Sequence, residues 1–215
     1  MTLLALYAEQ PLLDKDRYTE DEYFALEDRS PDRWEFLPDG PPASDGTRLG
    51  RIRAMSGGTL DHGSVSGNLL TALNIALRAA GVRTCRVFGS DVKIHPPEGR
   101  NTYPDVSVVC GRPDLYRKRR DIFTNPILVA EVLSPSTEAY DRNKKRLSYQ
   151  TTPTLEHYLL LSAHQARVEL YTREESGWHS EAYEGLETIM PLPALGVTLV
   201  LADLYVLVDV EQGTY

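Results

Sequence analysis

The sequence predicts an α/β fold in which a central mixed β-sheet is flanked by helices. Residues 126–133 form an apolar run that ends in a Ser-Pro-Ser turn, a pattern typical of a strand covered on both faces. Residues 61–80 carry apolar side chains at helical spacing, and Gly81 follows them as a helix stop. Short strand-like segments occur before and after both stretches, which favours a sheet with helices packed on it.

The first elements are a short helix and two strands. Thr19 with Glu22 three residues later has the pattern of a capping box, so a helix is expected to begin there. Strands are expected within 33–40 and 50–58. The stretch 38–50 between them is rich in Pro, Gly, Ser and Asp, which predicts an exposed loop.

The long helix is expected to begin at Asp61, with that residue as its N-cap. Strands should follow it, then a basic loop over 111–121, then the buried strand. The stretch 138–150 is predicted to be helical. The remaining strands are predicted at 82–88, 91–95, 103–110, 156–162 and 166–173, with further short strands and a last short helix or turn within 177–209.

Composition is that of one globular domain, with room for a small added lobe. The chain has 215 residues, of which 41% are hydrophobic and 25% charged. We expect an N-terminal tail over 1–16, a domain over 17–209 and a C-terminal tail over 210–215. The formal net charge of −8 argues against a dedicated nucleic-acid binder, so any contact with phosphate must be local.

The cysteines and the N-terminal stretch indicate the cellular compartment. Cys85 and Cys110 both lie in strand-like stretches, which predicts two small buried side chains in a reducing compartment and no disulfide framework. The apolar opening lacks the basic start and the length of a signal peptide or membrane span. A cytoplasmic protein is therefore expected.

Glu131 is the residue that most needs an explanation. It interrupts the apolar run, where an ionised side chain is costly unless something compensates it. Asp105 begins another apolar strand, and acids on neighbouring strands must share a proton or hold a cation when they come close. Mg²⁺ or Mn²⁺ would suit carboxylate oxygens. Lys145, on the next predicted helix, could orient an attacking water or stabilise charge on a phosphoryl oxygen, as in a metal-dependent phosphodiester hydrolase.

Several stretches together resemble a known family. They lie at 34–36, 54–63, 87–94, 103–109, 131–149 and 153–161. On these stretches the sequence resembles the Uma2 family, also called DUF820, of restriction-endonuclease-like proteins in the PD-(D/E)XK nuclease superfamily. The resemblance runs from about Tyr18 to Tyr205 and implies a restriction-endonuclease-like fold.

The resemblance assigns roles to three acidic residues. It places Asp105 and Glu131 on a metal ion, with Glu35 as an accessory acid. From the residues alone, Glu35 is as well explained as a surface strand residue paired with Arg33 or Arg53.

The same resemblance bears on a lysine and its neighbours. The superfamily pattern has a lysine two residues after the second acid, where this chain has Leu133. Uma2-like sequences instead carry a lysine four residues before a tyrosine, which Lys145 and Tyr149 match. The alternative for Lys145 is a solvated helix face. Asp91 and Lys93 could also line the site.

Other polar residues have more ordinary explanations. His62 could be a proton carrier or a ligand, but an exposed residue in the first helical turn is the simpler interpretation. His157 is expected to face outward. The basic stretch 116–121 could contact phosphate or be a charged surface loop. Ser134 and Ser136 lack the surroundings of a nucleophile and are explained by a turn and a helix cap.

The resulting hypothesis is a Mg²⁺- or Mn²⁺-dependent endonuclease that hydrolyses DNA. One alternative is a non-catalytic binding or assembly protein on the same fold, which the acidic composition favours. Another is a metal-dependent hydrolase of small phosphoesters. Exposed strand edges and the residues Leu204, Tyr205 and Leu207 also predict a self-associating surface, and hence a homodimer.

Overall fold

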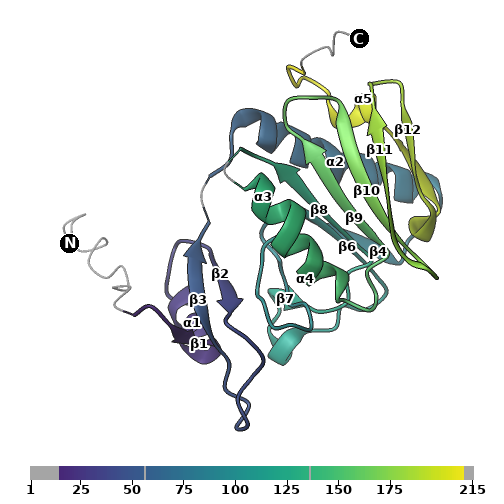
Figure 1. The fold of residues 1–215 in the computed structure, drawn as a ribbon. Coiled ribbons are helices and arrows are strands. Elements are labelled where there is room, and N and C mark those ends of the chain that lie inside the picture. Colours follow the sequence, from purple (N-terminus) through teal and green to yellow (C-terminus); the bar gives the residue numbers. More distant parts are fainter. Residues whose placement is uncertain (1–14, 56, 136, 211–215) are drawn as a thin grey trace, which may run out of the picture. The chain divides into compact units, whose positions relative to one another are not determined.

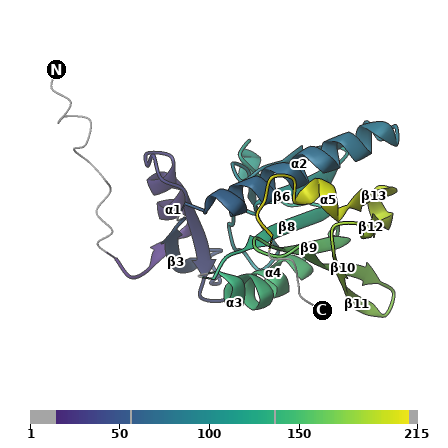
Figure 2. The ribbon, with the colours of Figure 1, turned by 90° about the horizontal axis from the view of Figure 1, so that it is seen from above.

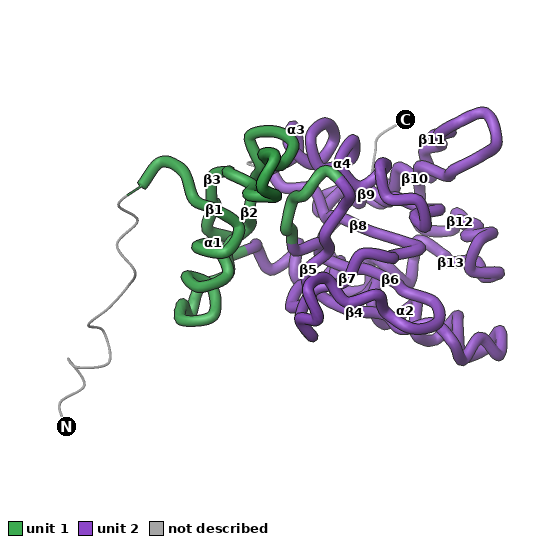
Figure 3. Tube along the Cα trace, turned by 90° about the horizontal axis from the view of Figure 1, so that it is seen from below, with its two compact units in different colours: residues 1–57, 98–102 green, residues 58–97, 103–215 purple. Residues whose placement is uncertain are grey.

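A computed structural model describes residues 15–55, 57–135 and 137–210 of the chain. These residues belong to two units, which Figure 3 colours separately. The first unit comprises the residues up to 57 together with 98–102, and the second comprises 58–97 and the residues from 103 onward. The expected helix cap at Ser136 lies outside the described residues.

The first unit is a small sheet with one helix. Its strands are β1 (Tyr18–Thr19), β2 (Trp34–Pro38) and β3 (Leu49–Ala54), in the antiparallel order β1-β3-β2, and its helix is α1 (Glu20–Glu27). The Glu22 N–H donates to Thr19 Oγ1 at 3.1 Å, and the Thr19 N–H donates to the Glu22 carboxylate at 2.9 Å. The predicted capping box is therefore confirmed.

The second unit is built on a six-stranded mixed sheet (Figure 1). Its strands in spatial order are β11 (Gly177–Glu184), β10 (Arg167–Glu174), β9 (His157–Ser162), β8 (Leu128–Leu133), β6 (Val106–Cys110) and β4 (Cys85–Phe88). Strands β8 and β9 are parallel, and the other neighbours in this sheet are antiparallel. Two small sheets join β5 (Lys93–Ile94) to β7 (Ile122–Phe123) and β12 (Ile189–Leu192) to β13 (Val197–Val200). The predicted α/β fold with a central mixed sheet is confirmed.

Helices cover both faces of this sheet (Figures 1 and 2). On one face lies α2 (Leu60–Ala79), with the β12–β13 hairpin and α5 (Leu201–Leu204) beside it. On the other lie α3 (Glu138–Tyr140), a π-helical turn over Asp141–Lys145, and α4 (Arg146–Gln150). Short 3₁₀ turns occupy Tyr116–Lys118 and Pro193–Leu195. Within the described residues, no helix has the length and apolar character needed to cross a bilayer.

The ends of α2 follow from its sequence, with one correction. The N-cap is Thr59, whose Oγ1 accepts from the His62 N–H at 3.2 Å, and Asp61 lies in the first turn. The prediction of Asp61 as the cap is therefore wrong by two positions. Gly81 has φ +72° directly after the C-cap, as expected of a glycine that ends a helix.

Strand β8 is buried along its whole length, as its apolar run predicts. Leu128, Ala130 and Val132 belong to the core cluster on the α2 face. Val129 and Leu133 belong to a second cluster on the face covered by α4. Because side chains alternate along a strand, Glu131 points to this second face.

The two cysteines form a disulfide. Cys85 lies opposite Cys110 in the register of β4 and β6, and the two sulfurs are bonded. The prediction of two unpaired cysteines is wrong, because the register of two strands that are distant in sequence brings their side chains together.

The predicted self-associating surface also needs correction. Leu204 and Tyr205 are buried core residues, at 0% and 4% exposure, and only Leu207 of the three is exposed. Tyr205 OH donates to the Arg167 carbonyl at 2.7 Å. Two of the three side chains therefore stabilise the core of the chain itself.

His157 is buried, although the sequence favours an outward position. It has 0% exposure at the start of β9. Its Nε2 accepts from the Ala194 N–H at 3.2 Å, and its Nδ1 lies 3.3 Å from Thr172 Oγ1. Burial lowers the pKa of His157 from 6.5 to about 4. The neutral ring is therefore part of the folded core.

This burial should make folding stability depend on pH. Between pH 4 and 6.5 the unfolded chain binds a proton on His157 that the folded chain does not, so stability is lost as the pH falls through this window. The expected loss is up to about 3 kcal/mol. Urea unfolding at several pH values should show it. His157→Gln should flatten the dependence and His179→Gln, at an exposed position, should not. Equal slopes in both variants would contradict the prediction.

Candidate functional site

Glu131 has its charge compensated by two residues from the following helical segment. Its side chain is 3% exposed. Lys145 Nζ donates to Glu131 Oε2 at 2.9 Å, and Tyr149 OH donates to Oε1 at 3.0 Å. Lysine and tyrosine four residues apart lie on one helix face, which allows both to reach the same carboxylate. The alternative of a solvated face is wrong for Lys145, which is buried.

A second carboxylate lies beside the lysine. Lys145 Nζ is 3.6 Å from Asp141 Oδ1, and both side chains are almost fully buried. The lysine therefore sits between Glu131 and Asp141. Sequence reasoning missed Asp141, although an acid four residues before a lysine on a predicted helix is a recognisable pairing pattern.

The pKa of Glu131 reflects these neighbours. Burial raises its pKa well above the ordinary value, and the nearby carboxylates of Asp141 and Asp105 raise it further. The Lys145 ammonium opposes this increase. The balance between ionised and protonated Glu131 thus depends directly on the lysine.

Asp105 reaches the same region from the neighbouring strand. Val106 on β6 lies opposite Ala130 on β8, so Asp105 and Glu131 are the next residues at that end of the pair. Asp105 Oδ2 accepts from the Val132 N–H at 2.7 Å, which fixes the side chain against β8. The structure thus places Asp105 opposite Glu131 in the strand register, close enough for its charge to raise the pKa of Glu131, and bonds Lys145 to Glu131.

His62 is a further residue of this group. Its Nε2 is 3.2 Å from Asp105 Oδ2, and its side chain is 20% exposed. The hydrogen bond to Asp105 raises the pKa of His62. The expectation of a merely exposed first-turn residue is wrong, because the start of α2 lies at the end of the sheet where Asp105 projects. The sequence offered no signal for this contact between distant segments.

The predicted lining residues have other surroundings. Lys93 is 2% exposed, with its Nζ 2.8 Å from Asp121 Oδ2 and 5.2 Å from the centre of the Tyr103 ring. Burial works against ionisation of Asp121, but hydrogen bonds from Arg119 and Lys93 lower its pKa to about 2. Lys93 is therefore part of an ion pair. Asp91 is exposed.

Glu35 belongs to the first unit. Its side chain is 1% exposed on β2, and it forms an ion pair with Arg53 on β3. The expected pairing with Arg53 is confirmed, but the expected surface position is wrong. Its accessory catalytic role stays a prediction.

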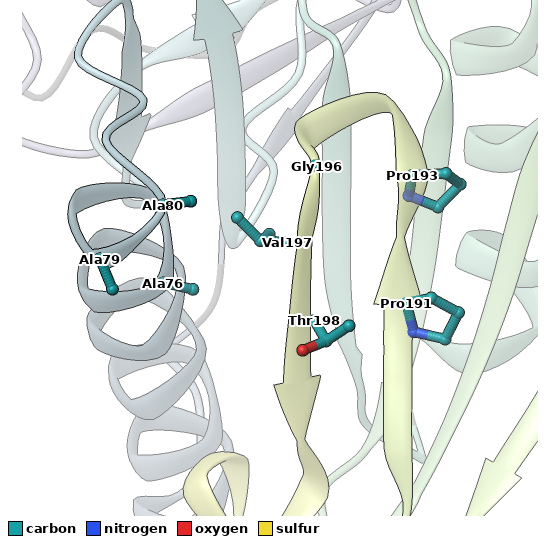
Figure 4. A pocket seen from close by; sticks show the side chains of 8 residues that line it. All are labelled: Ala76, Ala79, Ala80, Pro191, Pro193, Gly196, Val197 and Thr198. Atoms are coloured by element: carbon teal, nitrogen blue, oxygen red, sulfur yellow. The ribbon is translucent and has the colours of Figure 1, made fainter.

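One cavity of the second unit lies away from this group, between the end of α2 and the β12–β13 hairpin (Figure 4). Its volume is about 510 Å³. It is lined by small and apolar residues such as Ala76, Pro191 and Val197, and none of its described lining residues is ionisable. It therefore offers no acid, base or charged ligand.

The family model Uma2, described as "Putative restriction endonuclease", matches residues 20–204. The chain belongs to the Uma2 family. The match includes every residue of the group around Glu131, from His62 to Tyr149. The predicted family membership is therefore confirmed.

Two relatives of this Uma2 protein are proteins of Synechocystis. The uncharacterized protein slr1290 of Synechocystis is 33% identical over 202 residues, which cover 93% of this chain and 97% of the relative. The uncharacterized protein sll1609 of the same organism is 31% identical over 153 residues, which cover 71% of this chain and 78% of the relative. Both names leave the activity open.

A solved structure shares the fold of this Uma2 protein. It is the crystal structure of a protein from Anabaena variabilis described as a "putative nuclease belonging to DUF820". The TM-score is 0.65 at 19% identity, and the match covers 87% of this chain and 97% of the other. At this identity the likeness establishes the nuclease-like fold alone.

Proposed function

We propose that this Uma2 protein is a metal-dependent endonuclease that hydrolyses DNA phosphodiester bonds. The observation that carries the proposal is the placement of Asp105 opposite Glu131 at the end of adjacent strands, with the Lys145 ammonium 2.9 Å from Glu131. The family description supports nuclease chemistry.

The carboxylates fit a hard divalent cation. Mg²⁺ is commonly held by one or two carboxylates together with waters and substrate phosphate. Asp105 uses Oδ2 for both of its hydrogen bonds, and within the described part of the chain its Oδ1 accepts none. Asp105 and Glu131 would hold the ion, although no group of three or more His, Cys, Asp or Glu is arranged as a metal site among the described residues. When bound, such an ion polarises a phosphate oxygen and lowers the pKa of its water.

The surrounding residues would position the reactants. The Val132 N–H and His62 hold Asp105 in place through Oδ2. Lys145 carries a buried positive charge beside the carboxylates, where it can orient a water or stabilise charge that develops on a phosphoryl oxygen. Tyr149 fixes the other oxygen of Glu131.

One observation favours a non-catalytic binding protein as the second candidate. Lys145 and Tyr149 already bond both oxygens of Glu131, so burial of this acid does not require a cation. In that case the ion pair of Glu131 and Lys145 stabilises the fold, and the protein acts by binding a partner.

Calorimetry and a cleavage assay separate these candidates. The protein is titrated with Mg²⁺ and Mn²⁺, then incubated with supercoiled DNA, single-stranded DNA and a small phosphodiester. Metal binding with cleavage of DNA supports the endonuclease. Cleavage of the small ester alone would indicate a small-phosphoester hydrolase, and absence of metal binding and of cleavage would overturn the proposal in favour of the binding protein.

A homodimer and a cytoplasmic location stay proposals. With Leu204 and Tyr205 in the core, support for self-association reduces to the exposed Leu207 and the open sheet edges. Sedimentation over a range of protein concentrations tests the dimer, and a monomer throughout would refute it.

A further inference from the structure

A second cavity in the larger unit has the character of an anion site. It has a volume of about 350 Å³ and lies between edge strand β4 and the segment 112–123, which contains the basic stretch 116–121. Its lining includes Arg86, Arg112 and Arg120. The volume falls within the range typical of small-molecule sites.

The three arginines are not neutralised by the protein. Over residues 15–55, 57–135 and 137–210, their guanidinium groups make no hydrogen bond or ion pair, and none of the residues lining the cavity is acidic. Arg119 differs, because it is bonded to Asp121 at 3.1 Å. The basic stretch therefore contains both a structural arginine and an available one, Arg120. In a chain of net charge −8, such a local positive group is suited to an anion.

The cavity also has an apolar wall. Phe88 and Phe123 are in ring contact, with centroids 5.6 Å apart, and Phe88 is only partly buried. Leu115 is 45% exposed and belongs to the same lining. An apolar surface beside guanidinium groups suits a ligand that has an aromatic ring and a phosphate.

The loop that forms one side is held in place before any ligand binds. The Asn125 side chain donates to the Arg112 carbonyl at 3.0 Å and accepts from the Asp114 N–H at 2.8 Å. Leu115 forms a β-bridge with Phe123. Because the loop is fixed, binding need not pay the full cost of ordering it.

We propose that this cavity binds a nucleotide unit of single-stranded nucleic acid, with its phosphate on Arg86, Arg112 and Arg120 and its base against Phe88 and Leu115. Arg86 and Phe88 lie on the sheet face that also carries Glu131, since Phe88 pairs with Ser107 and Arg86 with Val109. The inference adds a substrate-binding site to the proposed nuclease function. A free nucleotide carries the same phosphate and base and could occupy the same cavity.

Binding can be measured without catalysis. A short fluorescent oligothymidylate is titrated with protein in EDTA at low salt, and binding is followed by anisotropy. Arg86→Ala and Arg120→Ala should each weaken binding about tenfold, the loss expected for a charged hydrogen bond. The matched control is Arg78→Ala, an exposed arginine on α2 and outside the cavity lining, which should bind as the parent does. Equal affinity of all three variants would overturn the proposal.

Competition identifies the part of the ligand that is recognised. Adenosine monophosphate should displace the oligonucleotide at lower concentration than inorganic phosphate, and Phe88→Leu should reduce this difference. Equal competition by both would show a simple anion site and refute a nucleotide site. If adenosine monophosphate binds to the cavity and the oligonucleotide does not, the proposal that the cavity binds single-stranded nucleic acid fails.

The result is independent of the proposed catalysis. Oligonucleotide binding is measured in EDTA, without the metal ion that Asp105 would hold, and Asp105 does not line this cavity, so cleavage by an Asp105→Asn variant is a separate measurement. Loss of cleavage in that variant with unaltered binding in the arginine variants would remove the second site and retain the nuclease. If the arginine variants lose binding and the parent protein does not cleave DNA, the nucleotide site is retained and the nuclease proposal fails.

Discussion

Asp105→Asn is expected to reduce DNA cleavage at least about 100-fold, the loss typical of removing one electrostatic contact in a catalytic site. The amide has the shape of the carboxylate, and its oxygen can still accept from the Val132 N–H, so the fold should be retained. A neutral amide, however, holds a divalent cation much less strongly than a carboxylate. Cleavage of supercoiled DNA in Mn²⁺ or Mg²⁺, followed on gels with time, measures the effect.

The matched control for this variant is Asp203→Asn. Asp203 is an exposed acid on α5, so the same chemical change there should leave the cleavage rate unaltered. Circular dichroism and thermal unfolding establish that both variants fold. A folded Asp105→Asn protein that cleaves at the parental rate would exclude Asp105 from the reaction.

Lys145→Met is expected to lower the free energy of unfolding by about 3–5 kcal/mol at neutral pH. The substitution leaves Glu131 buried without its cation, with Asp141 nearby. Glu131→Gln combined with Lys145→Met should recover much of the loss, because no buried charge of the pair then remains. Urea unfolding of the two single variants and the double variant gives their coupling energy.

Lys145→Met should also change how folding stability depends on pH. Burial raises the pKa of Glu131 in the folded protein, and removing Lys145 removes the group that opposes this increase. The folded variant then binds a proton that the unfolded chain releases, so its stability should fall as the pH rises above the ordinary value of 4.5. The neighbouring Lys144 is exposed, and Lys144→Met should show neither effect. Equal stability of the two methionine variants would contradict a buried pair.

The sequence was sufficient for the elements whose pattern is local. The burial of β8, the long helix α2 and the helical stretch 138–150 all follow from apolar periodicity and from turn residues. The resemblance to the Uma2 family singled out Lys145 and Tyr149 by their spacing, and the structure shows both bonded to Glu131.

The features that sequence reasoning missed depend on contacts between distant segments. The pairing of Cys85 with Cys110 requires the register of β4 against β6. The burial of His157 depends on the later segment that contains Ala194, and the contact of His62 with Asp105 depends on where α2 begins relative to the sheet. None of these can be inferred from the periodicity of one segment, because periodicity identifies a buried face and not the residues that cover it.

The π-helical turn over Asp141–Lys145 has a consequence for chain length. A π turn closes its hydrogen bond one residue later than an α turn, so it accommodates one residue more at nearly the same rise. Removing one residue such as Asn143, which is exposed, would convert the turn to ordinary α geometry, while the anchored helix α4 keeps its position. Chains shortened by this one residue would therefore still present a lysine to the buried glutamate. In such chains, the aspartate at the start of the turn would be displaced around the helix axis.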